Sequence, residues 1–263
     1  MPPEASPATG RSYRLLALLL FTTSALAWFV LWWWGDSPYL HYVHHAHLHA
    51  TAGGGEDLLY GLIFVAGWTV MTVAMMLPTS VPLIGLFSTV ARSRPDRSLL
   101  VAIVVVGYLL SWAAFGIVAY AGAMLLREAI ATSGWLAANG WAFGAGTLFV
   151  AGAYQFTSLK YKCLDKCRSP FTFVMEHWTG EHHARHALWL GVHHGLFCVG
   201  CCWTLMLLMF PFGAGNLGWM LFLGVLMAIE KNVSWGRQFG KPLGAALLLV
   251  GVLVALRMDS RLW

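Results

Sequence analysis

Five cysteines in one short window are the residues of this chain whose type and spacing could do chemistry. Two of them, Cys163 and Cys167, lie in a basic segment. The other three lie in the apolar stretch G-V-H-H-G-L-F-C-V-G-C-C-W, as Cys198, Cys201 and Cys202. Thiolates bind soft and borderline metal ions, above all Cu(I) and Zn(II). The clustering therefore predicts a sulfur metal site.

Methionine sulfur extends this prediction. On a helix, Cys198, Cys202 and Met206 share one face, and thioethers suit Cu(I) better than Zn(II). Met71 and Met75 lie one helical turn apart in another apolar stretch and are further candidate ligands. The competing interpretation stays open: buried cysteine and methionine often only pack, and buried thiols then remain protonated and inert.

A histidine-rich segment, residues 35–57, offers a second candidate site. It carries five histidines and no Lys or Arg. On a helix, His41, His45 and His49 share one face, an arrangement suited to Cu(II) or Zn(II) bound by neutral imidazole. A polar His-rich linker without a metal is the alternative.

Other polar residues lie close to the cysteines. His193 and His194 come one turn before Cys198, where either hydrogen bonds between helices or metal ligation would satisfy them. Glu230 and Lys231 end an apolar stretch. We expect these two as an exposed pair at the membrane interface, with a buried carboxylate completing the site as the alternative.

The composition decides what kind of structure positions these residues. With 59% hydrophobic and 10% charged residues, the chain has too little polar surface for a soluble globule. It predicts an all-α, polytopic transmembrane helix bundle of about seven spans, or six if the first is a cleaved signal. No basic stretch with interleaved aromatics indicates a nucleic-acid partner. The expected spans cover residues 15–34, 58–90, 99–126, 135–160, 188–211, 217–231 and 242–257.

Charge along the chain predicts the orientation. With a cytoplasmic N-terminus, all 16 Lys and Arg residues except Arg127, Arg257 and Arg261 fall on the cytoplasmic side, as the positive-inside rule requires. This favours a multi-pass protein of a bacterial-type inner (plasma) membrane. The thiols of residues 163 and 167 would then lie in a reducing compartment.

The expected domain organisation follows from the spans. Residues 1–13 form a cytoplasmic N-tail, and residues 14–263 form a single transmembrane helical domain. That domain carries the His-rich outer loop at 35–57 and a Cys- and His-containing cytoplasmic loop at 160–187. Small residues at Gly191 and Gly195, and at Gly140, Gly144 and Gly146, predict close helix approaches.

Three segments together resemble a family of metal-binding, copper-chaperone-like polytopic membrane proteins, of which a member supports copper loading of a tyrosinase. They are Trp68–Pro78, ending A-M-M-L-P, then Ala151–Lys160 continuing to Cys163 and Cys167, and Gly195–Trp203, followed by Glu230-Lys231. The resemblance implies a copper-handling helical protein with the five cysteines as candidate ligands. The histidines of segments 35–57 and 177–186 are not part of it.

The leading hypothesis is a non-enzymatic copper chaperone or metallation factor in the bilayer. It would bind Cu(I) through intramembrane Cys and Met and pass it to or from an apo copper enzyme or a soluble copper carrier. Cys163 and Cys167 would be the cytoplasmic docking point, and His41 to His49 the outer one. Zn(II) is the alternative metal, and homo- or hetero-oligomers are both compatible with the sequence. The alternative functions are a membrane thiol-disulfide/quinone oxidoreductase and a structural membrane subunit.

Overall fold

The structure is a computed structural model that describes residues 7–35, 54–178, 183–212 and 216–259. The regular secondary structure of these residues is entirely helical, which confirms the all-α prediction. His41, His45 and His49 lie outside the described residues. In chain order the helices are α1 Pro7–Gly35, α2 Gly54–Met75, η3 Pro78–Ser80, α3 Val81–Val90, α4 Arg97–Thr132, α5 Gly134–Ala138, α6 Trp141–Tyr154, α7 Ser158–Arg168, α8 Pro170–His177, α9 His183–Leu207, α10 Met209–Phe212, α11 Leu217–Asn232 and α12 Gly236–Asp259.

Five helices of the described chain are long and apolar enough to cross a membrane. The stretches concerned are Tyr13–Trp33, Leu58–Met75, Arg97–Thr132, His183–Pro211 and Gly236–Arg257. This confirms a polytopic helical protein compatible with a membrane, but the count of seven spans is not confirmed. Helices α6 and α11, expected as the fourth and sixth spans, have only 14 and 16 residues, whereas a span needs about 20.

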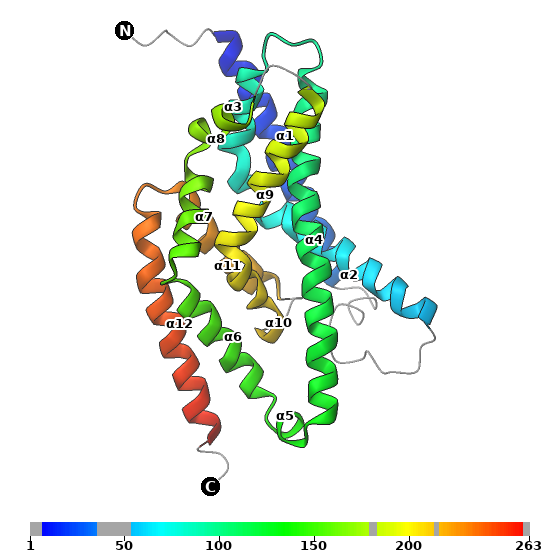
Figure 1. The fold of residues 1–263 in the computed structure, drawn as a ribbon, viewed down its shortest axis with the longest axis vertical. Helices are drawn as coiled ribbons and strands as arrows, with labels where there is room; N and C mark the ends of the chain where they lie inside the picture. The colour runs from blue at the N-terminus through cyan, green and yellow to red at the C-terminus, as the bar shows by residue number, and fades with distance from the viewer. Residues whose placement is uncertain (1–6, 36–53, 179–182, 213–215, 260–263) are drawn as a thin grey trace.

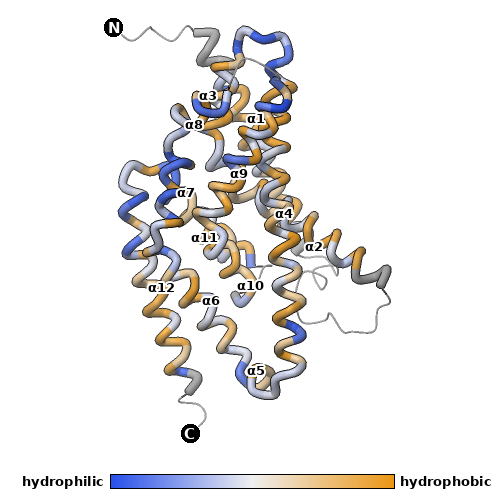
Figure 2. The backbone as a smooth tube through the Cα atoms, in the orientation of Figure 1, coloured by the Kyte–Doolittle hydropathy of each residue, from blue (hydrophilic) through white to orange (hydrophobic). Residues whose placement is uncertain are grey.

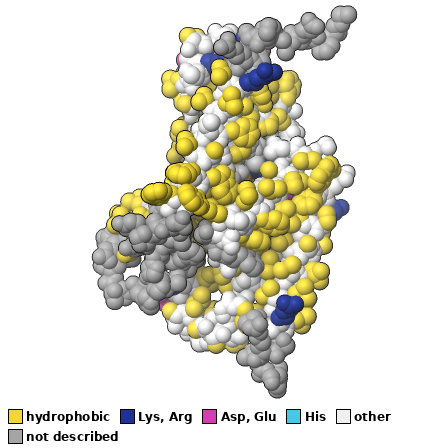
Figure 3. Space-filling model, turned by 180° about the vertical axis from the view of Figure 1, so that it is seen from behind, with side chains coloured by type: hydrophobic (Ala, Val, Ile, Leu, Met, Phe, Trp, Pro, Cys, Tyr) yellow, Lys and Arg dark blue, Asp and Glu magenta, His cyan; other side chains and the backbone are white. Residues whose placement is uncertain are grey.

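Apolar side chains cover the outside of the bundle. In Figure 2 the long helices are mostly hydrophobic, and hydrophilic segments gather at the α3–α4 connection and around α7. Figure 3 shows hydrophobic side chains spread over the rear face, with basic side chains at only a few points. Because lipid tails can solvate such a surface and water cannot, the outer face suits a bilayer.

Helix α9 occupies the centre of the bundle and packs closely against α4 (Figure 1). A Cβ atom added at Gly191 would overlap the carbonyl oxygen of Val104, and one at Gly195 would lie 2.6 Å from the Cβ of Ser111. The two glycines therefore allow the backbones to approach, as predicted. Gly140, Gly144 and Gly146 do not act in this way, because an added Cβ at Gly140 or Gly146 would meet nothing within 4 Å and one at Gly144 would make only an ordinary contact of 3.8 Å.

The stretch expected as one span over residues 58–90 is interrupted at Pro78. Proline has no N–H, so the carbonyl oxygen of Ala74 loses its helical partner. Helix α1 supplies the replacement donors, because Ser24 Oγ lies 2.7 Å and Trp28 Nε1 3.1 Å from that oxygen. Met76 consequently lies in a turn between α2 and η3, inside the bundle and off the regular face of α2.

Residues 160–187, expected as a cytoplasmic loop, contain two helices that pack into the bundle. Helix α7 begins where the side chain of Thr157 accepts a hydrogen bond from the backbone N–H of Lys160, and Pro170 starts α8. Figure 1 shows α7 lying between α9 and α12 near mid-height. The side chain of Lys160 is fully buried. The segment that the sequence predicts as a basic loop therefore contributes side chains to the core.

Candidate metal site

The three cysteines of α9 lie side by side in the core. Cys198, Cys201 and Cys202 are all buried. The Sγ atoms of Cys201 and Cys202 are 3.4 Å apart, and their thiols donate hydrogen bonds to the carbonyl oxygen of Cys198 at 3.1 and 2.9 Å. The predicted helical spacing thus places three sulfur atoms in one small volume.

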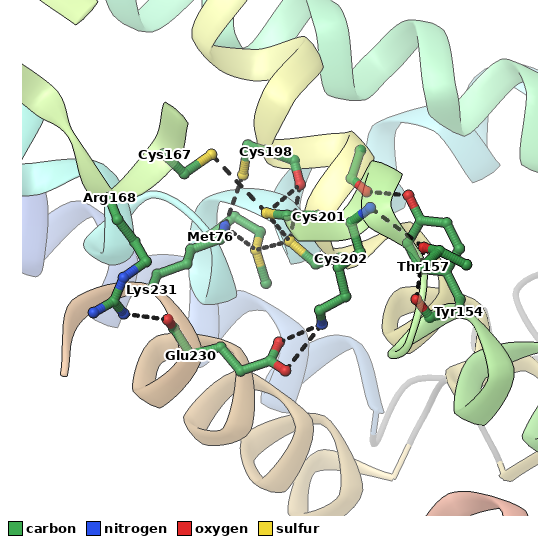
Figure 4. A network of polar contacts seen from close by, with 12 residues as sticks. Met76, Tyr154, Thr157, Cys167, Arg168, Cys198, Cys201, Cys202, Glu230 and Lys231 are labelled. Carbon is green, nitrogen blue, oxygen red and sulfur yellow. Dashed lines mark hydrogen bonds and ion pairs between the residues drawn. The ribbon is translucent and has the colours of Figure 1, made fainter. Parts of the chain in front are cut away.

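Helix α7 adds the other two cysteines to this volume. The Sγ atoms of Cys167 and Cys201 are 3.9 Å apart, and Cys163 packs against Gly200, where an added Cβ would lie 2.6 Å from its Sγ. Burial raises the pKa of the Cys163 thiol. All five cysteines are free thiols. Cys167 of α7 therefore lies in the same group as the trio on α9 (Figure 4), and Cys163 packs against α9 at Gly200.

A methionine completes the group, but a different one from those predicted. The Sδ atom of Met76 lies 4.0 Å from Cys202 Sγ. Met75 instead faces α11, with its Cε 3.5 Å from the position of a Cβ at Gly224. Met71 and Met206 are buried in the apolar core. The turn that precedes Pro78 explains why Met76 enters the site, because it leaves the helical face that Met71 and Met75 share. We call Cys167, Cys198, Cys201, Cys202 and Met76 the sulfur cluster.

A buried lysine contacts the sulfur cluster, and the expectation of an exposed Lys231 at the interface is wrong. Lys231 is 7% exposed. Its Nζ lies 2.8 Å from Cys198 Sγ, 3.5 Å from Met76 Sδ and 3.4 Å from Thr79 Oγ1. A buried ammonium requires an anionic partner. The thiolate form of Cys198 is the anion that the geometry offers.

The neighbouring Glu230 is buried as well, and it does not pair with Lys231. Its carboxylate oxygens lie 2.7 and 2.9 Å from Nζ of Lys160, and the two side chains are 2% and 0% exposed. Arg168 donates hydrogen bonds to the backbone oxygens of Glu230 and Ser234. The Glu230 carboxylate is therefore not a member of the sulfur cluster. Its ion pair with Lys160 links α11 to α7, the helix that carries Cys167 (Figure 4).

Hydroxyl groups from neighbouring elements contact α9, the helix that carries three of the cysteines. The hydroxyl of Tyr108 on α4 lies 3.0 Å from Cys198 Sγ. Tyr154 donates a hydrogen bond of 2.5 Å to the carbonyl oxygen of Gly200. His194, one turn before Cys198, has its Nε2 3.2 Å from Ser80 Oγ. For His194 the structure therefore shows a hydrogen bond between α9 and η3, one of the two roles left open by the sequence.

The donor set fits a soft ion by its chemistry. With metal–thiolate bonds of about 2.3 Å, as for zinc, two sulfurs bound to one ion in a trigonal plane would be roughly 4 Å apart. The contacts of 3.4, 3.9 and 4.0 Å within the cluster are close to that separation. Among the described residues, no group of three or more His, Cys, Asp and Glu side chains already has an arrangement that holds a metal ion. Metal binding would therefore require these side chains to move.

A helical bundle with a buried cluster of thiols and a thioether at its centre presents the donor atoms that soft metal ions prefer. The particular family is shown by residues 65–254, which match the family described as PpoB2: Copper chaperone, and the chain belongs to that family. This match covers α4, α7, α9 and α11 completely. No curated protein and no solved structure matches the chain.

Family membership confirms the resemblance seen in the sequence and indicates a copper-handling role. It is also consistent with a non-enzymatic protein.

Proposed function

We propose that this protein is a membrane copper chaperone that holds Cu(I) at the sulfur cluster and passes it to or from a partner copper protein. Cys201 and Cys202 on α9 and Cys167 on α7 supply the thiolates, and Met76 supplies a thioether. The observation that carries the proposal is the convergence of these four sulfur atoms from three separate segments at contacts of 3.4 to 4.0 Å.

The ligand types favour Cu(I) over Zn(II). Thiolate with thioether is a soft donor set, and Cu(I) is the softer ion. Thioether sulfur is a poor ligand for zinc, whose protein sites use Cys, His and carboxylate. In addition, the Lys231 ammonium, 2.8 Å from Cys198 Sγ, offsets one thiolate charge beside the bound ion.

The same proposal includes the seven-pass arrangement in a bacterial-type inner membrane with a cytoplasmic N-terminus. The distribution of Lys and Arg supports it. The alternation of chain direction through α4, α6, α9, α11 and α12 in Figure 1 is the one that such an arrangement needs. In this seven-span arrangement, α6 and α11 are short spans that pack against longer neighbouring helices.

The partner is an apo copper enzyme or a soluble copper carrier. Helix α7 is the element through which such a partner reaches the cluster, because Cys167 is the half-buried member of a set whose other cysteines are buried. Exchange of a ligand on an accessible cysteine is the usual way for a thiolate-bound ion to pass between proteins without entering solution. The His-rich segment at residues 35–57 would serve a partner on the outer side.

The test is the copper content of detergent-purified protein. Wild type, the Cys201→Ser/Cys202→Ser variant and a Cys163→Ser control are loaded with Cu(I) under anaerobic, reducing conditions and analysed for metal and sulfur ligation by X-ray absorption. Stoichiometric copper with sulfur ligands in wild type and in the control, and its loss in the double variant, is the expected result. Cys163 is the matched control because it lies on the same helix as Cys167, packs against Gly200 and is not a member of the sulfur cluster.

Equal copper in all three forms would show that the metal is bound elsewhere. A second candidate function, thiol-disulfide exchange, is favoured by one observation, the 3.9 Å separation of the Cys167 and Cys201 thiols. In that case wild type would bind no copper, and a disulfide between these two residues would form on addition of a quinone and be found by mass spectrometry.

A further inference from the structure

Two histidine rings from different helices meet above the sulfur cluster. His177 is the last residue of α8, and His193 lies on α9. Their ring centroids are 5.0 Å apart with an angle of 68° between the planes. Figure 1 shows α8 and the first half of α9 at the end of the bundle where the chain begins. Neither ring contacts the cluster, so the proposed copper site does not account for this pairing.

The hydrogen bond made by His177 leaves a nitrogen lone pair available. Its Nδ1 lies 2.9 Å from the carbonyl oxygen of Phe173. A carbonyl oxygen can only accept, so Nδ1 carries the proton and Nε2 is the free acceptor. The ring also stacks on Phe173, with a centroid distance of 4.4 Å and an angle of 22°. Metal-binding histidines are oriented in this way by a second hydrogen bond to a backbone carbonyl.

Unsatisfied nitrogen atoms on α9 point to a missing partner. The Nδ1 atoms of His193 and His194 are buried and have no hydrogen-bond partner in the part of the chain that the structure describes. Buried polar atoms without a partner are rare because they cost free energy. His194 is only 4% exposed, and its ring is fixed by Ser80 at Nε2 and by stacking on Tyr108.

The ring of Phe173 contacts both His177 and His194, so the histidines gather around one side chain on the way to the sulfur cluster. His194 follows His193 directly, and Cys198 lies one turn farther, about 6 Å along the helix. Tyr108 bridges the last step, since its ring stacks on His194 while its hydroxyl lies 3.0 Å from Cys198 Sγ. Groups that can bind copper therefore follow α9 from its half-exposed beginning to the buried thiols.

We propose that His177 and His193 form a second Cu(I) site, through which the ion reaches the sulfur cluster by way of His194. The inference rests on the proposed function, because the ion must be able to reside at the cluster. Two imidazoles bind Cu(I) less strongly than thiolates, so transfer toward the cysteines is favourable. The transfer onto His194 exchanges one Cu–N bond for another, and the transfer onto a cysteine replaces a Cu–N bond by a Cu–S bond. Copper remains Cu(I) throughout, and the proton of the thiol that becomes a thiolate is released to solvent.

The first experiment separates the rate of loading from the final copper content. Detergent-purified protein is mixed anaerobically with Cu(I) supplied as its acetonitrile complex, and the thiolate-to-copper absorption band is followed by stopped flow. The variant His177→Phe/His193→Phe keeps the aromatic contacts with Phe173 and Trp189 and removes both ligands. It should reach the wild-type copper content but load about tenfold more slowly. His186→Gln, two turns earlier on α9, is the matched control and should load at the wild-type rate.

A second measurement detects the imidazole site directly. In Cys201→Ser/Cys202→Ser protein at high Cu(I), X-ray absorption should show residual copper with nitrogen ligands, and the His177→Phe/His193→Phe changes added to it should remove that copper. Loading at the wild-type rate by the double histidine variant, or nitrogen-bound copper that persists without the two histidines, would overturn the proposal. Absence of copper from wild type would instead overturn the proposed function, so the two failures are distinguishable.

Discussion

Replacing Lys231 by methionine tests whether its ammonium is the counter-charge of the copper site. The substitution removes the charge and keeps an unbranched apolar side chain in the same space. Lys231 Nζ lies 2.8 Å from Cys198 Sγ. At that separation the attraction between an ammonium and a thiolate is about 6 kcal/mol for an effective dielectric constant of about 20. Loss of solvation by both groups offsets a large part of this.

The net effect should appear in copper binding and not in the stability of the metal-free protein. Removing one partner of a buried charge pair costs about 2–5 kcal/mol, so the Kd for Cu(I) should rise roughly 30-fold or more. Without copper, Cys198 can take up a proton when Lys231 is absent, so no charge remains buried alone. Unfolding of the metal-free variant should therefore occur at or above the wild-type temperature.

The assay is anaerobic competition for Cu(I) against a coloured Cu(I) chelator, combined with thermal unfolding in the same detergent. The control is Lys160→Met/Glu230→Gln, which removes the neighbouring buried ion pair and leaves the contacts of Lys231 with sulfur intact. A Kd for Lys231→Met within about threefold of wild type, or a tighter one, would refute the reasoning, because an ammonium that stabilises the site cannot be removed without loss.

Three other substitutions test the packing around the cluster. Glu230→Gln leaves its buried lysine partner without an anion and should destabilise the protein by about 3–5 kcal/mol, seen as a lower unfolding temperature; an unchanged temperature would contradict the buried ion pair. Gly200→Ala brings a Cβ to 2.6 Å from the sulfur of Cys163, so it should push α7 away from α9. Cu(I) affinity in the competition assay should fall by about tenfold. Unaltered affinity would count against a contribution of α7 to the site. Gly191→Ala should reduce the yield of folded protein in fluorescence-detected gel filtration, because α4 and α9 can no longer approach each other closely. Gly146→Ala is the control and should give the wild-type yield. Equal yields from the two variants would contradict the close approach of α4 and α9.

The sequence predicts well what depends on composition and on local periodicity. Long apolar stretches identify the membrane helices because each satisfies its own backbone hydrogen bonds. The spacing of Cys198, Cys201 and Cys202 predicts that they lie together on α9, since a helix places residues three and four apart on one side. The identity of the copper family could also be recognised from its motifs.

The rest of the site depends on contacts between distant segments. Lys160 and Glu230 each resemble an ordinary charge at a membrane boundary, and only their meeting shows that both are buried. Lys231 was misjudged for the same reason, because its partner is a cysteine on another helix. Met76 was missed because regular helical spacing favours Met71 and Met75. Pro78 is the sequence signal that points to Met76, because a proline without an N–H disturbs the preceding helical turn and changes the direction of the side chains there.

The ion pair between Lys160 and Glu230 also bears on how the chain is made. Its two members are 70 positions apart, so the ribosome adds the lysine long before its carboxylate partner exists. A lone ammonium is costly to place in a lipid or apolar protein environment. Helix α7 should therefore wait at the aqueous boundary during synthesis and settle against α9 only when α11 has emerged. Cys167 would then join the cysteines of α9 late in biogenesis.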